Sequence, residues 1–152
     1  MRSTKLAQNG QSTFVLVFDK GDEFISGLNS FAAKNGLGGS HFTAIGAFSD
    51  VMLGYFDRQA KDYRKIPIEE QVEALSLVGD IALKGDSPQV HAHLVAGKAD
   101  GTAYGGHLLQ AHVWPTLEVI LTESPRHLSR KTDAETGLAL IDLSASSDGR
   151  IE

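Results

Sequence analysis

The sequence predicts an α+β domain, in which a mostly antiparallel sheet packs against a single helix. Short runs of β-branched and aromatic residues recur along the chain between glycine- and aspartate-containing breaks, as is typical of strands. Only one segment has an apolar face at helical spacing. The length of 152 residues, with 41% hydrophobic and 22% charged residues, fits one domain with its own core.

The predicted helix follows the first predicted strand, "FVLVF" at residues 14–18. "GDEF" comes next and offers Asp22 as the helix cap. "KNGLGG" predicts the end of the helix, with Asn35 and Gly36 in the usual C-terminal positions. Between them, apolar residues recur on one helix face: Phe24, Ile25, Leu28, Phe31 and Ala32.

The remaining apolar runs predict strands. Ser49-Asp50 suggests a tight hairpin between two of them, and "GKADG", with Gly101 available for a positive φ, predicts a second hairpin. Pro67 confines its strand to a sheet edge or a strand end. The expected strands cover residues 41–48, 51–56, 63–68, 71–83, 89–96, 104–109, 116–123 and 137–143. A sheet of this size covered by one helix leaves an apolar face open, and symmetric oligomers usually bury such faces.

The polar ends of the chain predict flexible termini at residues 1–11 and 144–152, which leaves one domain over residues 12–143. There is no cysteine, so a disulfide framework and a thiolate metal site are excluded. The apolar runs are far shorter than the ~18 residues of a membrane span. "MRSTKLAQNG" lacks the apolar segment of a signal peptide, so we expect a cytoplasmic protein without membrane contact.

The charge of the chain argues against a protein that binds nucleic acid by itself. The net charge is −5, whereas phosphate neutralisation by basic side chains supplies most of the affinity for DNA. One dense basic group, "PRHLSRK", carries Arg126, Arg130 and Lys131. It is interpreted as a solvated turn between strands, and the alternative is a local edge that contacts DNA or another anion.

Three of the six histidines fall within "VHAHLVAGKADGTAYGGHLL", residues 90–109. His91 and His93 point to the same face of a strand because successive side chains alternate. The turn that follows would bring His107 back beside them, and Gly105 and Gly106 leave room for close approach. Three imidazoles with an open fourth position are typical of a catalytic zinc site, in which zinc lowers the pKa of bound water to about 7.

Other interpretations of the histidines stay open from spacing alone. A His-x-His pair is common on exposed sheet faces, where it has no ion to bind. Iron, nickel or copper would accept the same three ligands as zinc. Glu118 faces opposite to Leu117 and Val119, which suits either a proton acceptor beside a bound ion or a plain surface carboxylate.

Four segments resemble, in this order, the plant and prokaryote conserved (PPC) domain: "FTAIGAFSDVMLGYFD", "VEALSLVGDIAL", "HAHLVAGKADGTAYGGHLL" and "TLEVILTE". "SLVGDI" and "GGHL" are the most specific parts. The resemblance implies an α+β fold assembled as a homotrimer. Its metal-containing prokaryotic members imply that His91, His93 and His107 bind a divalent metal, expected to be zinc. The fold is also similar to that of acetolactate decarboxylase, a zinc enzyme with a comparable histidine set.

The resemblance leaves two classes of function. PPC proteins are often described as DNA-binding, since in plants the domain accompanies AT-hook motifs, but this sequence has no Arg-Gly-Arg-Pro hook. The first hypothesis is therefore a regulatory binding module that recognises a protein partner or a small ligand. The alternative is a metal-dependent lyase or hydrolase acting on a small carbonyl or carboxylate substrate. In a third interpretation the ion has a structural role only and stabilises a hairpin or a subunit interface.

Overall fold

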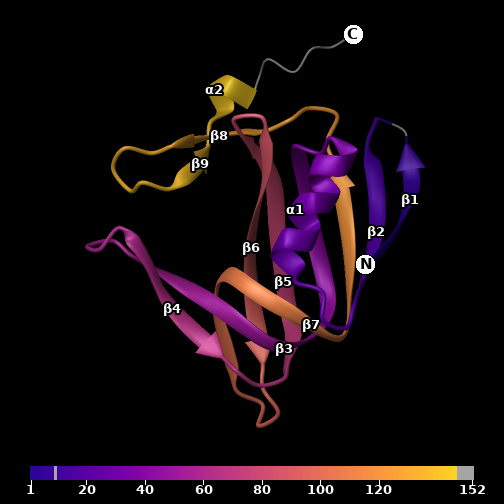
Figure 1. Ribbon diagram of the computed structural model, residues 1–152. Helices are drawn as coiled ribbons and strands as arrows, with labels where there is room; N and C mark the ends of the chain where they lie inside the picture. The colour runs from indigo at the N-terminus through magenta and orange to yellow at the C-terminus, as the bar shows by residue number, and fades with distance from the viewer. Residues whose placement is uncertain (9, 147–152) are drawn as a thin grey trace.

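The computed structural model describes residues 1–8 and 10–146, and the prediction of an α+β fold is confirmed (Figure 1). The described residues form one nine-stranded sheet, in which all pairings are antiparallel except that of β5 with β8. The strands are β1 (Arg2–Gln8), β2 (Ser12–Asp19), β3 (Gly39–Asp57), β4 (Asp62–Ile68), β5 (Val72–Lys84), β6 (Ser87–Gly97), β7 (Ala103–Glu123), β8 (Ser129–Thr132) and β9 (Ala139–Ile141); the helices are α1 (Phe24–Asn35) and α2 (Leu143–Ser146).

Four of the strands close into a circuit. β3 pairs with both β5 and β7, and β6 also pairs with both β5 and β7. The 21 residues of β7 make this possible. The start of β7 pairs with β6, its end pairs with β2, and nearly the whole strand also pairs with β3. β7 therefore links the strand that carries His91 and His93 to the rest of the sheet.

The predicted hairpin at Ser49-Asp50 is wrong, because β3 runs without a turn from Gly39 to Asp57. The strand bends instead through irregular register between Gly46 and Asp50. Gly46 has a φ of 143°, and a Cβ there would lie 2.3 Å from the Thr116 carbonyl oxygen, so glycine permits the close approach of β7. Likewise, the strands expected at 104–109 and 116–123 are parts of the single strand β7.

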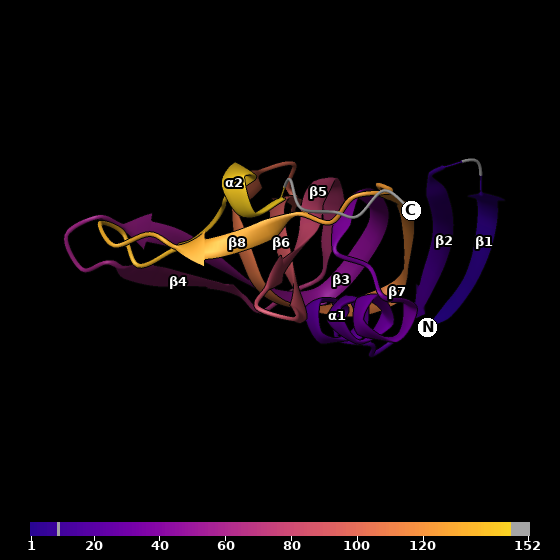
Figure 2. The same ribbon diagram turned by 90° about the horizontal axis from the view of Figure 1, so that it is seen from above.

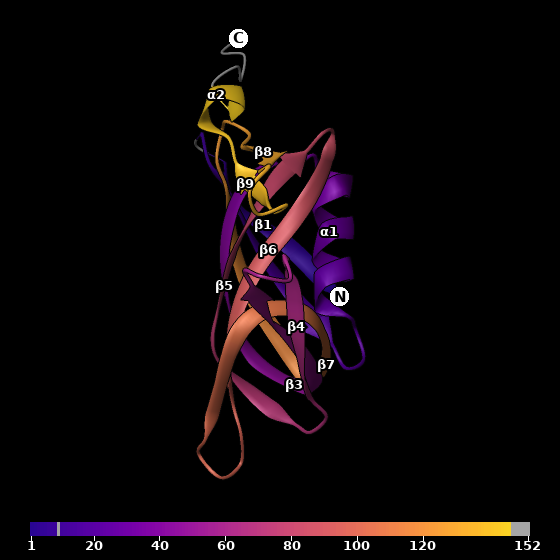
Figure 3. The same cartoon turned by 90° about the vertical axis from the view of Figure 1, so that its left-hand side faces the viewer.

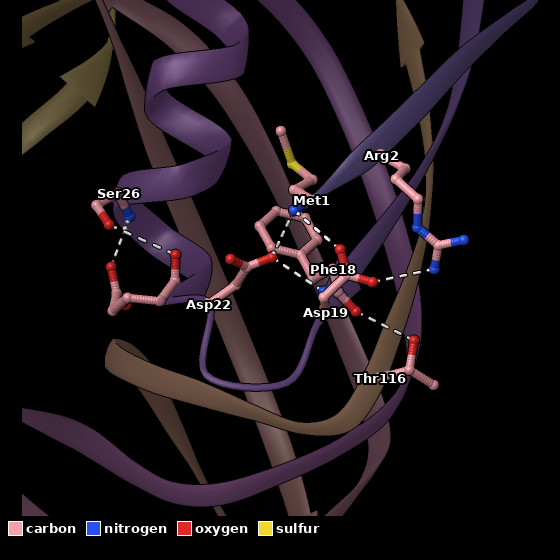
Figure 4. A network of polar contacts seen from close by, with 8 residues as sticks. Met1, Arg2, Phe18, Asp19, Asp22, Ser26 and Thr116 are labelled. Atoms are coloured by element: carbon pink, nitrogen blue, oxygen red, sulfur yellow. Dashed lines mark hydrogen bonds and ion pairs between the residues drawn. The ribbon is translucent and has the colours of Figure 1, made fainter.

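The N-terminal segment, expected to be flexible, forms strand β1. It pairs with β2 from Arg2↔Val17 to Gln8↔Ser12, because the edge of β2 offers backbone groups that a polar strand can satisfy while its side chains face water. The Met1 ammonium pairs with Asp19 and Asp22 at 3.2 and 2.8 Å (Figure 4). At the other end, residues 144–146 belong to α2, and residues 147–152 lie outside the described residues.

Helix α1 is capped by Glu23, not by Asp22 as predicted. The Glu23 carboxylate accepts hydrogen bonds from the backbone N–H groups of Ile25 and Ser26 at 3.1 and 2.7 Å. It also accepts one from Ala111 on β7 at 3.2 Å. Asp22 instead accepts the N–H of Asp19 at 2.9 Å. The helix ends at Gly36 in the left-handed conformation (φ 64°), which confirms the predicted stop.

Replacing Glu23 by alanine is expected to lower the free energy of unfolding by about 1–2 kcal/mol. The change removes the cap of α1 and leaves the Ala111 N–H without its acceptor. Urea unfolding monitored by circular dichroism measures the loss. Asp22→Ala is the matched control, because Asp22 makes only exposed contacts that are worth about 0.5 kcal/mol. An equal loss in both variants would contradict this assignment of the cap.

The core lies between α1 and one face of the sheet, and within the part of the chain that the structure describes the opposite face carries no long helix (Figures 2 and 3). Phe24 of α1 is fully buried, and its ring centroid lies 5.4 Å from Phe18 and 5.9 Å from Phe42. The opposite face carries apolar side chains that the described residues leave exposed: Ile45, Leu75, Val78, Val95 and Ile120. No helix among the described residues is long and apolar enough to cross a bilayer.

Candidate metal centre

The three histidines meet on one face of the sheet. β6 points His91 and His93 to the same side, and the hairpin through Gly101 (φ 83°) returns the chain so that His107 on β7 pairs directly opposite His93. One ring nitrogen from each histidine lies within 4.8 Å of those of the other two. The hairpin thus brings His107 back beside His91 and His93, as expected from the sequence.

The geometry of the cluster suits a single cation. His91 Nε2 and His93 Nε2 are 3.2 Å apart, close enough to share either a proton or an ion that each contacts at about 2.0–2.1 Å. His107 Nδ1 is buried and has no hydrogen-bond partner. Three imidazole nitrogens without a fourth protein ligand leave a coordination position open. The residues therefore fit a transition metal such as zinc.

Tyr63 of β4 fixes the ring of His107. The two rings stack with centroids 4.6 Å apart and planes 22° apart. Gly54 of β3 lies between them in the sheet, since it pairs with His107 on β7, and a Cβ on Gly54 would lie 2.7 Å from Tyr63 Cδ1. Glycine at 54 thus lets the tyrosine cross β3 and reach the histidine.

Asp80 of β5 lies behind His91. The two residues pair across β5 and β6, and Asp80 Oδ2 is 3.8 Å from His91 Nδ1, too far for a hydrogen bond. The carboxylate is held instead by Arg130 of β8, whose guanidinium donates to Asp80 Oδ1 and, at 3.0 Å, to the Ala139 carbonyl oxygen. Asp80 therefore acts on His91 through its negative charge, not through a hydrogen bond.

Burial is the main cause that lowers the pKa of His107 to about 4, and charge on His91 and His93 contributes to the same shift. Burial also lowers the pKa of His91, and Asp80 partly offsets this effect. His107 is therefore neutral at pH 7, which is the form that binds a metal.

This shift predicts a pH dependence for the metal-free protein. The pKa of His107 is about 4 in the fold against an ordinary histidine value of 6.5, so the unfolded chain binds the proton more readily. The resulting stabilisation is present above pH 6.5 and is lost as the pH falls through 4. Because His107 is only half-buried, we expect a loss of about 1–2 kcal/mol. Urea unfolding of the wild type and His107→Gln at pH 7 and pH 4 measures it; equal losses would contradict the assignment.

A pocket of about 170 Å³ opens beside the histidines. Its polar lining comes from Tyr63, Gln89, His91, His107 and Arg130. The rest of its lining is apolar and consists of Val90, Leu138, Ala139 and Leu140. A polar end against an apolar wall is typical of a small-molecule site.

Of the other predicted site residues, only Arg130 lies beside the histidines. Glu118 is exposed on the far part of β7 and pairs with Val17 and Ile45, so it does not reach the histidines. In the basic group, Arg126 and Lys131 are exposed, whereas the side chain of Arg130 is only 5% exposed and is paired with Asp80. The group is therefore not one basic stripe, since its central member neutralises a carboxylate instead of facing solvent.

Tyr63, Asp80 and Gln89 also belong to the site and were not predicted from the sequence. Asp80 falls opposite His91 because the two-residue turn Gly85-Asp86 sets the register of β5 and β6 at this point. A Gly-Asp turn between two strands is the sequence signal that could have placed Asp80 there. Tyr63 is reached through β4, which was correctly expected as a short edge strand.

Residues 5–125 match the sequence pattern of the Plants and Prokaryotes Conserved (PCC) domain. The chain belongs to this family. A metal-containing protein of Archaeoglobus fulgidus is 36% identical, with a TM-score of 0.79 over 86% of this chain and 92% of that one. A PPC protein of Pyrococcus horikoshii is 30% identical, with a TM-score of 0.81 over 93% and 94%. These likenesses confirm the family predicted from the four sequence segments.

Two further relatives of this PCC domain carry less information. A suggested DNA-binding protein of Bacteroides thetaiotaomicron is 24% identical with a TM-score of 0.84 over 93% of this chain and 98% of that one, which shows the shared fold alone. The bifunctional protein GlmU of a Synechococcus strain is 32% identical over 120 residues, 77% of this chain. The chain spans 18% of the length of that curated relative. The likeness to acetolactate decarboxylase stays a prediction.

Proposed function

We propose that this PCC domain is a homotrimeric binding module that holds one divalent transition metal, expected to be zinc, through His91, His93 and His107. The observation that carries the proposal is the meeting of three histidine nitrogens within 4.8 Å of one another. The metal-containing relative from Archaeoglobus fulgidus supports it, because that protein is 36% identical over most of its length. When bound, the metal would supply an open position for a small ligand.

The trimer is supported by the uncovered face of the sheet. A row of paired residues runs across that face and ends at the metal centre: Val15, Ile120, Thr43, Val78, His93 and His107. Contact between copies of the chain would bury the exposed members of this row. We expect a partner of the assembly to be a small ligand or a second protein, not duplex DNA.

The charge distribution argues against duplex DNA as a partner. Three chains of −5 give −15, which repels a polyanion. Arg130 is withdrawn from the basic group by Asp80, so Arg126 and Lys131 are left as separate exposed charges. The metal-dependent enzyme considered as an alternative would need a proton-transfer group at the ion, and Glu118 does not serve, because it lies on the far part of β7.

The test is elemental analysis of the purified, untagged protein together with light scattering. We expect about one zinc or other transition metal per chain in a trimer, and a His93→Ala variant that loses the metal but remains trimeric. Loss of the trimer together with the metal would show that the ion pins the interface instead. In a filter-binding assay at about 0.1 M salt, mixed-sequence duplex DNA should not bind; micromolar affinity would contradict the charge argument.

A further inference from the structure

Unpaired buried polar atoms gather around a single pocket. Among the residues that the structure describes, the buried side-chain atoms without a hydrogen-bond partner are Gln89 Oε1, His107 Nδ1 and Arg130 Nε. All three residues line the 170 Å³ pocket beside the histidines. Buried polar atoms are normally paired, because leaving one unpaired costs free energy. Their gathering here indicates a place that a polar ligand completes.

Arg130 provides the charged part of this place. Its side chain is 5% exposed, and its guanidinium is oriented by bonds to Asp80 and to the Ala139 carbonyl oxygen. The remaining Nε–H can only donate, so it calls for an acceptor on the ligand. Asp80 cancels the charge of Arg130, but three neutral imidazoles do not cancel that of a bound divalent ion. With the metal present, the pocket therefore favours an anion.

Gln89 requires a hydrogen-bond donor on the ligand, whereas Arg130 requires an acceptor. Its Oε1 atom can only accept, so the ligand must bring an O–H or N–H group. Gln89 lies two residues before His91 on β6, on the same side of the strand, so the donor it needs lies beside the metal centre. A ligand that satisfies both residues has an anionic oxygen and a neighbouring donor.

The size and walls of the pocket limit the rest of the ligand. Its volume of about 170 Å³ is below the ~300 Å³ of the smallest pockets that hold drug-sized molecules. Leu138, Ala139 and Leu140 form an apolar wall, which suits a short alkyl group. This wall and Arg130 come from the segment that carries β8 and β9, beyond residues 5–125 that match the family (Figures 1 and 3).

We propose that the pocket between the three histidines and the β8–β9 hairpin binds a small hydroxycarboxylate. The Arg130 Nε–H donates to the carboxylate, the ligand hydroxyl donates to Gln89 Oε1, and the alkyl group lies against Leu138 and Leu140. The proposal rests on the proposed function, because the bound metal supplies the positive charge that favours the anion. It adds the ligand class and assigns its recognition to residues that do not bind the ion.

The test uses two probes of nearly equal size, lactate and propionate, which differ by one hydroxyl group. Calorimetric titration of the zinc-loaded wild type is expected to show lactate binding about fivefold more tightly than propionate. Gln89→Leu should weaken lactate binding about fivefold and leave propionate unchanged. Arg130→Lys keeps a positive charge beside Asp80 but loses the Nε–H, and it should weaken both probes by about twentyfold. Lys131→Gln, an exposed neighbour outside the pocket, should change neither.

Zinc content is measured on each sample before titration, which separates the two proposals. If the wild type holds zinc but binds lactate and propionate equally, or binds neither, the ligand proposal is overturned and the metal proposal stands. If the wild type retains no zinc but still prefers lactate and loses this preference in Gln89→Leu, the metal proposal falls, and the recognition of the ligand by Gln89 and Arg130 stands without the charge of the ion. Should Arg130→Lys fail to fold, Gln89→Leu with the two probes decides the question alone.

Discussion

His107→Ala is expected to abolish stoichiometric metal retention. The variant keeps His91 and His93, but two imidazoles on an exposed strand are a weak ligand set, and the third nitrogen within 4.8 Å is gone. We expect the affinity for zinc to fall by more than about 100-fold, beyond the 10- to 100-fold cost of losing only a supporting residue around a ligand. Competition with a chromophoric chelator at pH 7.5 measures the change directly.

The control for this experiment is His41→Ala. His41 is exposed on β3 and lies outside the cluster, so its removal should leave zinc stoichiometry and affinity unchanged. Circular dichroism should show both variants folded, since the core contains none of the three histidines. Zinc retention in His107→Ala equal to that of the wild type would contradict the assignment of His107 as a metal ligand.

Phe24→Ala is expected to lower the free energy of unfolding more than Glu23→Ala does. Phe24 is fully buried where α1 meets the sheet, and its ring lies against Phe18, Phe42 and Phe48. Truncation removes the buried surface and leaves a cavity, which costs about 3–5 kcal/mol. Since domains are stable by only about 5–15 kcal/mol, a large part of the stability would be lost. Urea unfolding of the metal-free protein at pH 7 measures it.

The matched control is Leu143→Ala, because Leu143 is 75% exposed at the start of α2. Its replacement should change the free energy of unfolding by less than about 0.5 kcal/mol. A loss of under about 1 kcal/mol for Phe24→Ala would show that α1 is not essential to the core. The sheet would then have to be stable without the packing of α1.

The sequence predicted the fold class and the histidine cluster because both depend on local patterns. Alternation on β6, the turn at Gly101 and the pairing of His93 with His107 all lie within one hairpin. The polar surroundings of the cluster depend partly on longer connections. Asp80 is local, because the tight turn between β5 and β6 sets it opposite His91. Tyr63 and Arg130 arrive on β4 and β8, which reach the cluster only through the pairing of β3 with β7 and of β5 with β8.

The errors have the same origin. Ser49-Asp50 has the composition of a turn, but Asp50 pairs with His112 on β7 at 2.7 Å, and this long-range contact keeps β3 extended. Asp22 is a good cap by residue type, but Glu23 has the longer side chain and reaches both the helix and Ala111. Residues 2–8 looked like a polar tail because an edge strand needs no apolar face of its own.

The position of the ligands within one hairpin has a consequence for folding. His93 and His107 are directly opposite each other but only fourteen residues apart in sequence, so an ion between them would act as a cross-link across a short loop. A cross-link closing about 15 residues restricts the unfolded chain by about 3 kcal/mol. The domain should therefore fold first and take up its ion afterwards, unlike small zinc modules that collapse only around the metal. Removal of the ion by a chelator would lower the free energy of unfolding but leave the domain folded.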